Sequence, residues 1–258
     1  MIPILSIAGS DCSGGAGIQA DIKTISACKM YAMSVITAVT AQNTLGVQAV
    51  SAVSAEMVSK QIDSVFADIV PKAVKIGMLC DAEIVMAVAE RLKYYKAENV
   101  VIDPVMLSTS GRALLDDKAV ELAEKELFPM AALLTPNIPE AMRLSGMEIR
   151  GMDSAAAAAA ALKEKYGCAV LIKGGHGRDG CNDLLLADKE YVYRCAKIEN
   201  PNTHGTGCTL SSAIACGLGK GLSLPESVRL AKAYITGAIK DGMKIGHGNG
   251  PLNHFWEK

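Results

Sequence analysis

A glycine-rich turn late in the chain carries the strongest chemical signal in the sequence. Residues 202–211 read Asn-Thr-His-Gly-Thr-Gly-Cys-Thr-Leu-Ser, so Gly205 and Gly207 flank Thr206 just before a predicted helix. Backbone N–H groups and the positive end of the helix dipole make such a turn a pocket for anions. Cys208 falls in the first helical turn, where a thiolate is stabilised and can act as a base or nucleophile near neutral pH. The alternative is a structural cysteine that is buried beside a tight turn.

Other polar residues follow predicted strands in the middle of the chain. Lys173 ends an apolar run and precedes two glycines, so its ammonium can reach phosphate groups unless it is simply solvated there. Asn137 and Glu140 are three residues apart, which places both side chains on one face of a helical turn. Their oxygen atoms suit Mg²⁺, directly or through water, although Asn137 is also a good helix cap. Asp103 ends another strand, where doubly wound sheets bind ligands, and is a further candidate for Mg²⁺ or phosphate.

Two more glycine-rich segments match the dinucleotide-binding pattern G-x-G-x-x-[GA]. Residues 15–20 follow a strand and open a helix, as a Rossmann site requires. The second strand, however, ends in Thr-Ala-Gln-Asn at residues 40–43, which offers no carboxylate for the ribose hydroxyls. Residues 175–180 lead into a predicted hairpin, so no helix N-terminus awaits a pyrophosphate there. An NAD site at residues 15–20 is therefore the less favoured interpretation.

The elements that position these residues follow from an alternation of short β-branched runs and helical segments. We predict strands over 2–8, 34–41, 48–53, 73–77, 100–103, 132–135 and 168–173, and an antiparallel hairpin over 183–187 and 191–196. We predict helices over 15–30, 55–67, 81–96, 116–127, 139–145, 206–219 and 225–241. The alanine run at 155–161 indicates a close-packed helix with Asp153-Ser154 as its N-cap. The alternation predicts one α/β domain over residues 1–258, with a mostly parallel sheet covered by helices on both faces.

Composition excludes several classes of protein. The 258 residues are 50% hydrophobic, and 26 Lys and Arg balance 27 Asp and Glu. A net charge of -1 argues against a binder of nucleic acid or membrane surfaces, and the apolar content argues against disorder. Residues 1–8 resemble a first strand and not a signal peptide, and no apolar run is long enough to span a membrane. No C-x-x-C pair occurs among the eight cysteines, so we expect a cytoplasmic protein whose thiols are reduced and mostly buried.

Seven segments, spread over nearly the whole chain, together indicate a protein family, although each segment alone is a weak signal. They are Ala8-Gly-Ser-Asp-Cys-Ser-Gly-Gly-Ala-Gly-Ile-Gln-Ala-Asp21, Ala38-Val-Thr-Ala-Gln-Asn-Thr44, Lys75-Ile-Gly-Met-Leu79, Asp103-Pro-Val-Met106, Thr135-Pro-Asn-Ile-Pro-Glu-Ala141, Lys173-Gly-Gly-His176 and His204-Gly-Thr-Gly-Cys-Thr209. In this order they resemble the ribokinase-like kinases, and among these the hydroxymethylpyrimidine/phosphomethylpyrimidine kinases of thiamine biosynthesis. The resemblance implies a three-layer α/β/α sandwich, ATP and Mg²⁺ as cofactors, a small pyrimidine as substrate and a homodimer.

The resemblance also implies roles for the late glycine-rich turn. Gly205, Thr206 and Gly207 would donate backbone N–H groups to the transferring phosphoryl group. Most members of the superfamily carry Asp at the end of this turn, whereas the pyrimidine kinases are similar to this chain in having Cys. Cys208 would therefore be the base that takes the proton from the hydroxymethyl group. Lys173, Asn137, Glu140 and Thr206 would bind the ATP phosphates, with Asn137, Glu140 and Asp103 near Mg²⁺.

Substrate recognition is expected closer to the N-terminus. By resemblance Gln42 binds the pyrimidine, since its amide offers both a donor and an acceptor to a ring nitrogen and an exocyclic amine. Gly9, Asp21 and Met78 would line the same pocket, with the Asp21 carboxylate accepting hydrogen bonds from the aminopyrimidine. An exposed helical carboxylate at Asp21 and a core position for Met78 are the alternatives. Residues 108–111 resemble a flap, and they lack the second cysteine found there in similar kinases that favour pyridoxal.

The sequence therefore predicts an ATP- and Mg²⁺-dependent kinase. It would phosphorylate 4-amino-5-hydroxymethyl-2-methylpyrimidine and then convert the monophosphate to the diphosphate. A pyridoxal or pyridoxine kinase of the same fold is the main alternative. A nicotinamide-dependent enzyme and a pyrimidine-binding protein without catalysis are two others, and a pure binder would not need Cys208, Lys173, Asn137 and Glu140.

Overall fold

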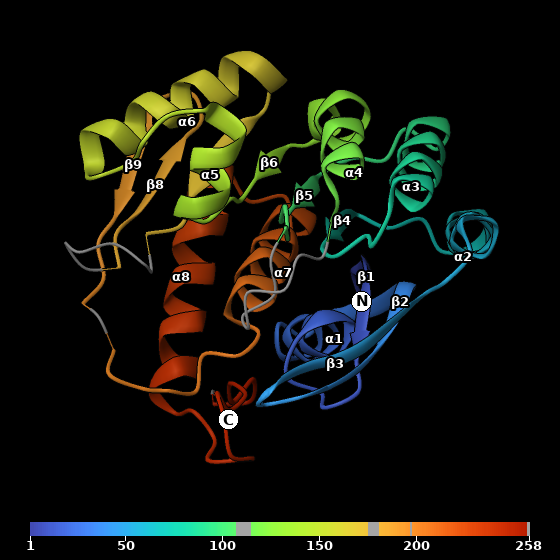
Figure 1. Cartoon of the computed structure of the whole chain (residues 1–258), viewed down its shortest axis with the longest axis horizontal. Coiled ribbons are helices and arrows are strands. Elements are labelled where there is room, and N and C mark those ends of the chain that lie inside the picture. Colours follow the sequence, from blue (N-terminus) through green and yellow to red (C-terminus); the bar gives the residue numbers. More distant parts are fainter. Residues whose placement is uncertain (107–114, 175–180, 197, 257–258) are drawn as a thin grey trace.

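A mostly parallel sheet organises the chain in this computed structural model, which describes residues 1–106, 115–174, 181–196 and 198–256. Within these ranges nine strands pair in the order β3-β2-β1-β4-β5-β6-β7-β8-β9 (Figure 1). Neighbours from β2 to β7 are parallel, whereas β3 at one edge and β8 and β9 at the other are antiparallel. The strands are β1 (Pro3–Asp11), β2 (Tyr31–Asn43), β3 (Gly46–Ala52), β4 (Ala73–Ile76), β5 (Val100–Ile102), β6 (Leu133–Leu134), β7 (Ala169–Ile172), β8 (Asp183–Leu186) and β9 (Glu190–Tyr193). The predicted sheet and its C-terminal hairpin are confirmed.

Helices cover both faces of the sheet, and a separate apolar cluster fills each interface (Figure 1). One layer holds α1 (Gly17–Ala27), α7 (Thr206–Gly219) and α8 (Leu224–Lys240). The other holds α2 (Ala55–Asp68), α3 (Ala82–Tyr94), α4 (Asp117–Leu122), α5 (Ile138–Ser145) and α6 (Met152–Tyr166). A π-helical turn (Ala123–Leu127) and a short 3₁₀-helix (Phe128–Met130) extend α4. The predicted three-layer α/β/α arrangement is confirmed.

Small side chains let α7 lie close to the sheet. All residues from Thr209 to Leu218 are buried, and most of them are Ala, Ser, Gly or Cys. A Cβ at Gly219 would lie 2.4 Å from the Ile4 side chain, and one at Gly217 would lie 2.6 Å from Ser227 of α8. The N-terminus of α7 is thus held against the carboxyl ends of the central strands, where ligands bind in open α/β sheets.

Some expectations from the sequence are wrong in detail. Gly151, and not Asp153-Ser154, is the N-cap of α6, and the Ser154 hydroxyl accepts from the Gly151 N–H at 3.1 Å. All eight cysteines lie in the described ranges without a disulfide, but only Cys168 and Cys216 are buried and Cys12 is exposed. The flap expected at 108–111 and the glycine-rich residues 175–180 lie outside the described residues. Within the described residues, no helix combines the length and the apolar character needed to cross a bilayer.

A buried ion pair joins α1 to the sheet and to α7. Lys75 of β4 and Asp21 of α1 have no exposed side-chain surface, and the ammonium lies 2.9 and 2.8 Å from the two carboxylate oxygens. The hydroxyls of Ser6 on β1 and Ser212 on α7 donate to the same carboxylate at 2.5 and 2.8 Å. Burial disfavours the charge of Lys75, but the Asp21 carboxylate outweighs it and raises the pKa of the ammonium. One carboxylate therefore ties two strands and two helices together.

Replacing Lys75 with Met should destabilise the fold strongly. The Asp21 carboxylate would stay buried without its cation, so we expect the free energy of unfolding to fall by about 3–5 kcal/mol in chemical denaturation. Lys60→Met, which breaks the exposed Lys60–Glu56 pair of α2, is the control and should leave that energy unchanged. The double variant Lys75→Met/Asp21→Leu should recover part of the loss, because it removes the unpaired charge. A Lys75→Met protein as stable as the control would contradict this prediction.

Candidate active site

Two loops pack against each other at the N-terminus of α7. Gly205 is the N-cap residue with φ +83°, and a Cβ there would lie 2.0 Å from the carbonyl oxygen of Gly15. A Cβ at Gly15 would in turn lie 2.4 Å from the imidazole ring of His204. Glycine is required at these contacts because the backbones approach so closely. The loop before α1 and the loop before α7 therefore form one unit.

Cys208 lies in the first turn of α7, and its thiol is half-buried against the start of α1. Burial raises the pKa of the thiol above its ordinary value. The Lys75 ammonium and a hydrogen bond from the Gly17 N–H lower it, whereas the carboxylates of Asp21 and Asp103 raise it again. The thiol form therefore predominates at neutral pH in the free protein. This shift is opposite to the expected stabilisation of the thiolate, because burial and two carboxylates outweigh the Lys75 ammonium and the Gly17 N–H.

The three residues expected to form an anion hole do not lie in equivalent positions. The Thr206 N–H and hydroxyl both point to the Thr203 carbonyl oxygen, at 3.3 and 2.6 Å, so they are occupied within the loop. Gly207 follows in the first turn, where helix geometry leaves backbone N–H groups without intrahelical acceptors. A Cβ at Gly207 would lie 3.0 Å from an Asp103 carboxylate oxygen and 3.5 Å from the Lys173 ammonium. Gly207 thus lies against the polar residues that follow β5 and β7.

Lys173 and Asp103 form an ion pair across the carboxyl edge of the sheet. The Lys173 ammonium lies 2.5 Å from an Asp103 oxygen, and the side chain of Lys173 is only 15% exposed. The Thr135 hydroxyl donates to the same oxygen at 3.2 Å. Burial opposes the charge of Lys173, but Asp103 and Glu140 outweigh it and raise its pKa. Lys173 is therefore a cation that an ion pair fixes at the edge of the site, and not a solvated lysine.

Asn137 and Glu140 cap the start of α5. The Asn137 side chain accepts from the Glu140 N–H and the Glu140 carboxylate accepts from the Asn137 N–H, both at 2.9 Å. The capping interpretation of Asn137 is confirmed, and its amide oxygen is occupied. Burial raises the pKa of Glu140 to about 7; Lys173 acts against this shift and the nearby Asp103 carboxylate adds to it. A further cation at this point would relieve the repulsion between the two carboxylates.

The donor set of this corner fits a magnesium ion that is shared with a ligand. Across the described ranges, no three His, Cys, Asp or Glu side chains group closely enough to hold a metal ion by themselves. Asp103 and Glu140 supply two hard oxygen donors beside Lys173. Mg²⁺ is commonly held by one or two carboxylates together with substrate phosphates, so the residues present suit such an ion.

Of the residues expected at the pyrimidine, Gly9 and Met78 lie together, whereas Gln42 and Asp21 have other neighbours. A Cβ at Gly9 would lie 3.2 Å from the Met78 sulfur, and Gly9 also touches Gly17, whose N–H contacts Cys208. Gln42 lies near the end of β2 and is half-buried, and its neighbours are Cys12, Thr40 and His204. Asp21 departs from the expectation, because its carboxylate is fully buried and its oxygens accept from Lys75, Ser6 and Ser212. Asp21 therefore stabilises the strands and helices that carry the site, and it does not face a substrate.

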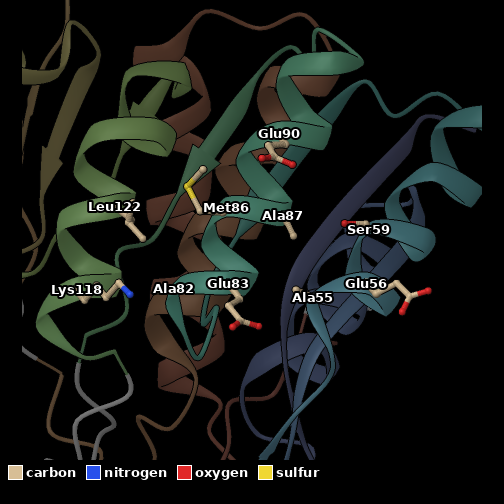
Figure 2. Close-up of a pocket in the computed structure, with 10 residues that line it drawn as sticks. All are labelled: Ala55, Glu56, Ser59, Ala82, Glu83, Met86, Ala87, Glu90, Lys118 and Leu122. Carbon is tan, nitrogen blue, oxygen red and sulfur yellow. The ribbon is translucent and has the colours of Figure 1, made fainter.

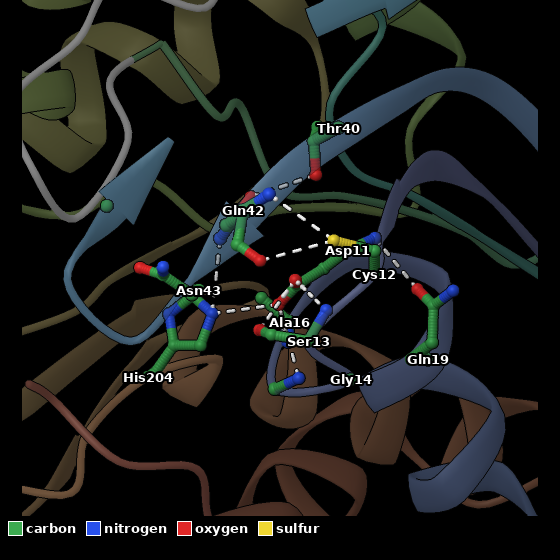
Figure 3. Close-up of polar contacts among 12 residues, drawn as sticks. Asp11, Cys12, Ser13, Gly14, Ala16, Gln19, Thr40, Gln42, Asn43 and His204 are labelled. Carbon is green, nitrogen blue, oxygen red and sulfur yellow. Dashed lines mark hydrogen bonds and ion pairs between the residues drawn. The ribbon is translucent and has the colours of Figure 1, made fainter. Parts of the chain in front are cut away.

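The sequence did not single out Asp11, which with His204 anchors the loop before α1 (Figure 3). His204 Nε2 lies 2.9 Å from an Asp11 oxygen, so His204 hydrogen-bonds within the site. Asp11 also accepts from the N–H groups of Ser13, Gly15 and Ala16 at 2.8 to 3.2 Å. A carboxylate at the end of the first strand, three residues before Gly-Gly, was the available signal. For Lys75 the signal was a lysine inside the otherwise apolar run of β4.

A separate groove of about 470 Å³ lies between α2, α3 and α4 (Figure 2). Its lining residues are Ala55, Glu56, Ser59, Ala82, Glu83, Met86, Ala87, Glu90, Lys118 and Leu122. None of the candidate site residues lines it, and three glutamates give it an acidic rim. The groove is therefore distinct from the candidate active site.

Comparison with known proteins gives consistent relatives over nearly the full chain. The family model described as phosphomethylpyrimidine kinase matches residues 11–253. A hydroxymethylpyrimidine/phosphomethylpyrimidine kinase of Rhizobium meliloti is 50% identical over 256 residues, which cover 97% of this chain and 96% of the relative. The crystal structure of a phosphomethylpyrimidine kinase from Clostridium difficile is 47% identical, covers 93% of this chain and 100% of that chain, and has a TM-score of 0.84. The ADP complex of Bacillus subtilis pyridoxal kinase is 34% identical with a TM-score of 0.90, covering 98% of this chain and 97% of that chain. The ribokinase-like fold and the family expected from the sequence are confirmed.

Gly205→Ala should separate the two loops of the site. The new Cβ would meet the Gly15 carbonyl at a backbone with positive φ, so the loss has a conformational part and a steric part. Gly146→Ala is the matched control, because Gly146 has φ +69° with nothing within 4 Å of a Cβ. We expect the control to lose about 1–2 kcal/mol of unfolding free energy for its left-handed backbone. Gly205→Ala should lose clearly more in the same denaturation experiment, and equal losses would contradict the packing of the two loops.

Proposed function

The chain belongs to the phosphomethylpyrimidine kinase family, and we propose that it phosphorylates 4-amino-5-hydroxymethyl-2-methylpyrimidine with ATP and then its monophosphate to the diphosphate. This is the pyrimidine branch of thiamine biosynthesis that the resemblance implies. The enzyme is a phosphotransferase, like the relatives named above.

One observation carries the proposal: two consecutive residues of α7, Gly207 and Cys208, lie against two different groups of residues. Cys208 contacts the Gly17 N–H, next to the cluster of Gly9 and Met78. Gly207 lies against Asp103 and Lys173, the residues suited to phosphate and cation. An acceptor hydroxyl beside Cys208 and a phosphoryl group beside Gly207 would therefore be neighbours, which is the positioning that phosphoryl transfer needs.

In the first reaction Cys208 is the proposed base. Its sulfur takes the proton of the substrate hydroxyl as that oxygen forms its bond to the γ-phosphorus of ATP, and the bond from the γ-phosphorus to ADP breaks. Because burial raises its pKa, the thiol must first lose its own proton to solvent, and the Lys75 ammonium and the Gly17 N–H favour the resulting thiolate. Gln42, Gly9 and Met78 would hold the pyrimidine ring.

The opposite side of the site would hold the ATP phosphates. Lys173 supplies the positive charge, and Gly207 lies beside it and would donate its N–H, with Gly205 and Thr206 shaping the turn. Asp103 and Glu140 would hold Mg²⁺ with the phosphates, and Asn137 would keep Glu140 in place through the cap of α5. When bound, the ion would neutralise charge on the transferring group.

The second reaction has a different need, because its acceptor is a phosphate oxygen that is already ionised. Cys208 has no proton to remove there, whereas the requirement for Lys173 and the α7 N-terminus is the same.

A homodimer, a cytoplasmic location and a single domain over residues 1–258 stay predictions. The pairing of all described strands in one sheet supports the single domain.

An ATPase-coupled assay with the pyrimidine and with pyridoxal as acceptors tests the function. We expect the pyrimidine to be the better substrate by kcat/KM. The likeness to a pyridoxal kinase makes pyridoxal the competitor to examine. Gln42→Ala should raise the KM for the pyrimidine, and turnover at unchanged KM would show that the substrate residue is wrongly assigned. A preference for pyridoxal would contradict the proposed function. The absence of ADP release with both compounds would contradict it as well.

Cys208→Ala should slow the first reaction far more than the second. General-base catalysis contributes about 10²–10⁴-fold, so we expect a loss in that range for the alcohol acceptor and a much smaller loss for the monophosphate. The wild-type rate of the first reaction should also rise with pH above neutrality, because its thiol has a raised pKa. Single-turnover rates with each acceptor, measured on the same preparations, decide the question. Equal losses in both reactions would rule out this division of roles.

A further inference from the structure

Four side chains form a polar row beside the proposed pyrimidine pocket (Figure 3). Asp11 contacts His204, and His204 Nε2 lies 3.2 Å from one terminal atom of the Gln42 amide. The other terminal atom of that amide lies 3.2 Å from the Thr40 hydroxyl. Asp11, Thr40 and His204 are only 3%, 5% and 6% exposed. The hydrogen atoms available at the two ends of this row determine which way the amide between them can face.

Asp11 fixes the hydrogen at the first end. Burial would raise the pKa of Asp11, but hydrogen bonds from His204, Ser13 and the Ala16 N–H outweigh it and hold the pKa at about 2. An ionised carboxylate only accepts hydrogen bonds. His204 Nε2, 2.9 Å from this carboxylate, must therefore carry a hydrogen, whether the ring is neutral or protonated.

Thr40 fixes the other end. Its hydroxyl has one hydrogen, and the Ser10 carbonyl oxygen, which can only accept, lies 3.0 Å away. With that hydrogen used, the Thr40 oxygen offers a lone pair to Gln42. If the amide nitrogen faced His204, its N–H and the Nε2–H would point at each other, with no acceptor between them. The Thr40 hydrogen would then be shared between the carbonyl oxygens of Gln42 and Ser10. A half-turn of the amide removes the conflict at Thr40, because the NH₂ group then donates to the Thr40 lone pair. At His204 it replaces a donor that faces a donor with an acceptor, and the carbonyl oxygen then shares the Nε2 hydrogen with the Asp11 carboxylate.

We propose that His204, held by Asp11, is a positioning residue that fixes this orientation of the Gln42 amide and so selects a 4-aminopyrimidine over a 4-oxopyrimidine. The inference rests on the proposed function. The amide would present an acceptor on its His204 side and a donor on its Thr40 side. An amino group beside an unprotonated ring nitrogen matches that order, whereas an oxo group beside a ring N–H reverses it. The backbone of Gln42 cannot turn to compensate, because its N–H and carbonyl both contact the Cys12 sulfur, at 3.3 and 3.2 Å.

The test compares kcat/KM for 4-amino-5-hydroxymethyl-2-methylpyrimidine and for its 4-oxo analogue. Sites that hydrogen-bond a substrate reject the mismatched analogue strongly, so we expect the wild-type protein to prefer the amino compound by about 10²-fold or more. His204→Leu removes the donor, and the preference should fall by about 10-fold or more. His204→Gln keeps an N–H donor near the position of Nε2 and should retain the preference. A purely structural role for His204 would lower both rates together and leave their ratio unchanged.

Thr40→Val provides a second route if His204→Leu does not fold. It removes the lone pair at the other end of the row and should also lower the preference. Thr24→Val on α1, which loses a buried hydroxyl bonded to the Ala20 carbonyl, is the matched control and should not change the ratio. An unchanged ratio in His204→Leu and Thr40→Val would overturn the positioning role alone. A wild-type protein that phosphorylates neither compound would overturn the proposed function, and the selectivity with it.

Discussion

The ion pair between Lys75 and Asp21 is the constraint on which the rest of the site depends. It lies directly under the junction of β1, β4, α1 and α7, and hydroxyls from β1 and α7 complete the shell of the carboxylate. Two charges without solvent are stable only when each stays close to the other. Any displacement of α1 or of the first turns of α7 would separate these partners. The same pair sets the field at Cys208, because the thiol is close enough to be affected by both charges.

Above this pair, the parallel strands bring distant segments to one edge. Asp11 is the last residue of β1, Asp103 and Lys173 directly follow apolar strands, and the order of strands in the sheet determines which of these residues meet. Asp103 and Lys173 are 70 residues apart and form an ion pair because β5, β6 and β7 are adjacent. Asp11 meets His204 because Gly15 and Gly205 allow their loops to touch. Glycine thus acts here by permitting contact between backbones, and the charged side chains use that proximity.

The helices and strands were predictable from the sequence, whereas the long-range contacts of the site residues were not. The bounds of α7 follow from the glycine-rich turn and the apolar run after it, and the N-x-x-E spacing gave the cap of α5. Asp21 was expected to face the substrate because its position on α1 was visible and its partner, 54 residues away in β4, was not. The pKa of Cys208 was expected to fall because the helix N-terminus is a local signal. The burial and the two carboxylates that raise it come from other segments.

The charges of the site are already paired inside the protein, and this determines what a ligand must do. Lys173 is held by Asp103, so an anion that binds Lys173 has to compete with a carboxylate 2.5 Å away. When that anion takes over the ammonium, Asp103 loses its cation beside Glu140, whose own charge is disfavoured by burial. Two neighbouring carboxylates without a cation repel each other, and a divalent ion that arrives with the anion removes this repulsion. The arrangement therefore favours an anion accompanied by a metal ion over a free anion. A nucleotide that carries its own cation meets this requirement.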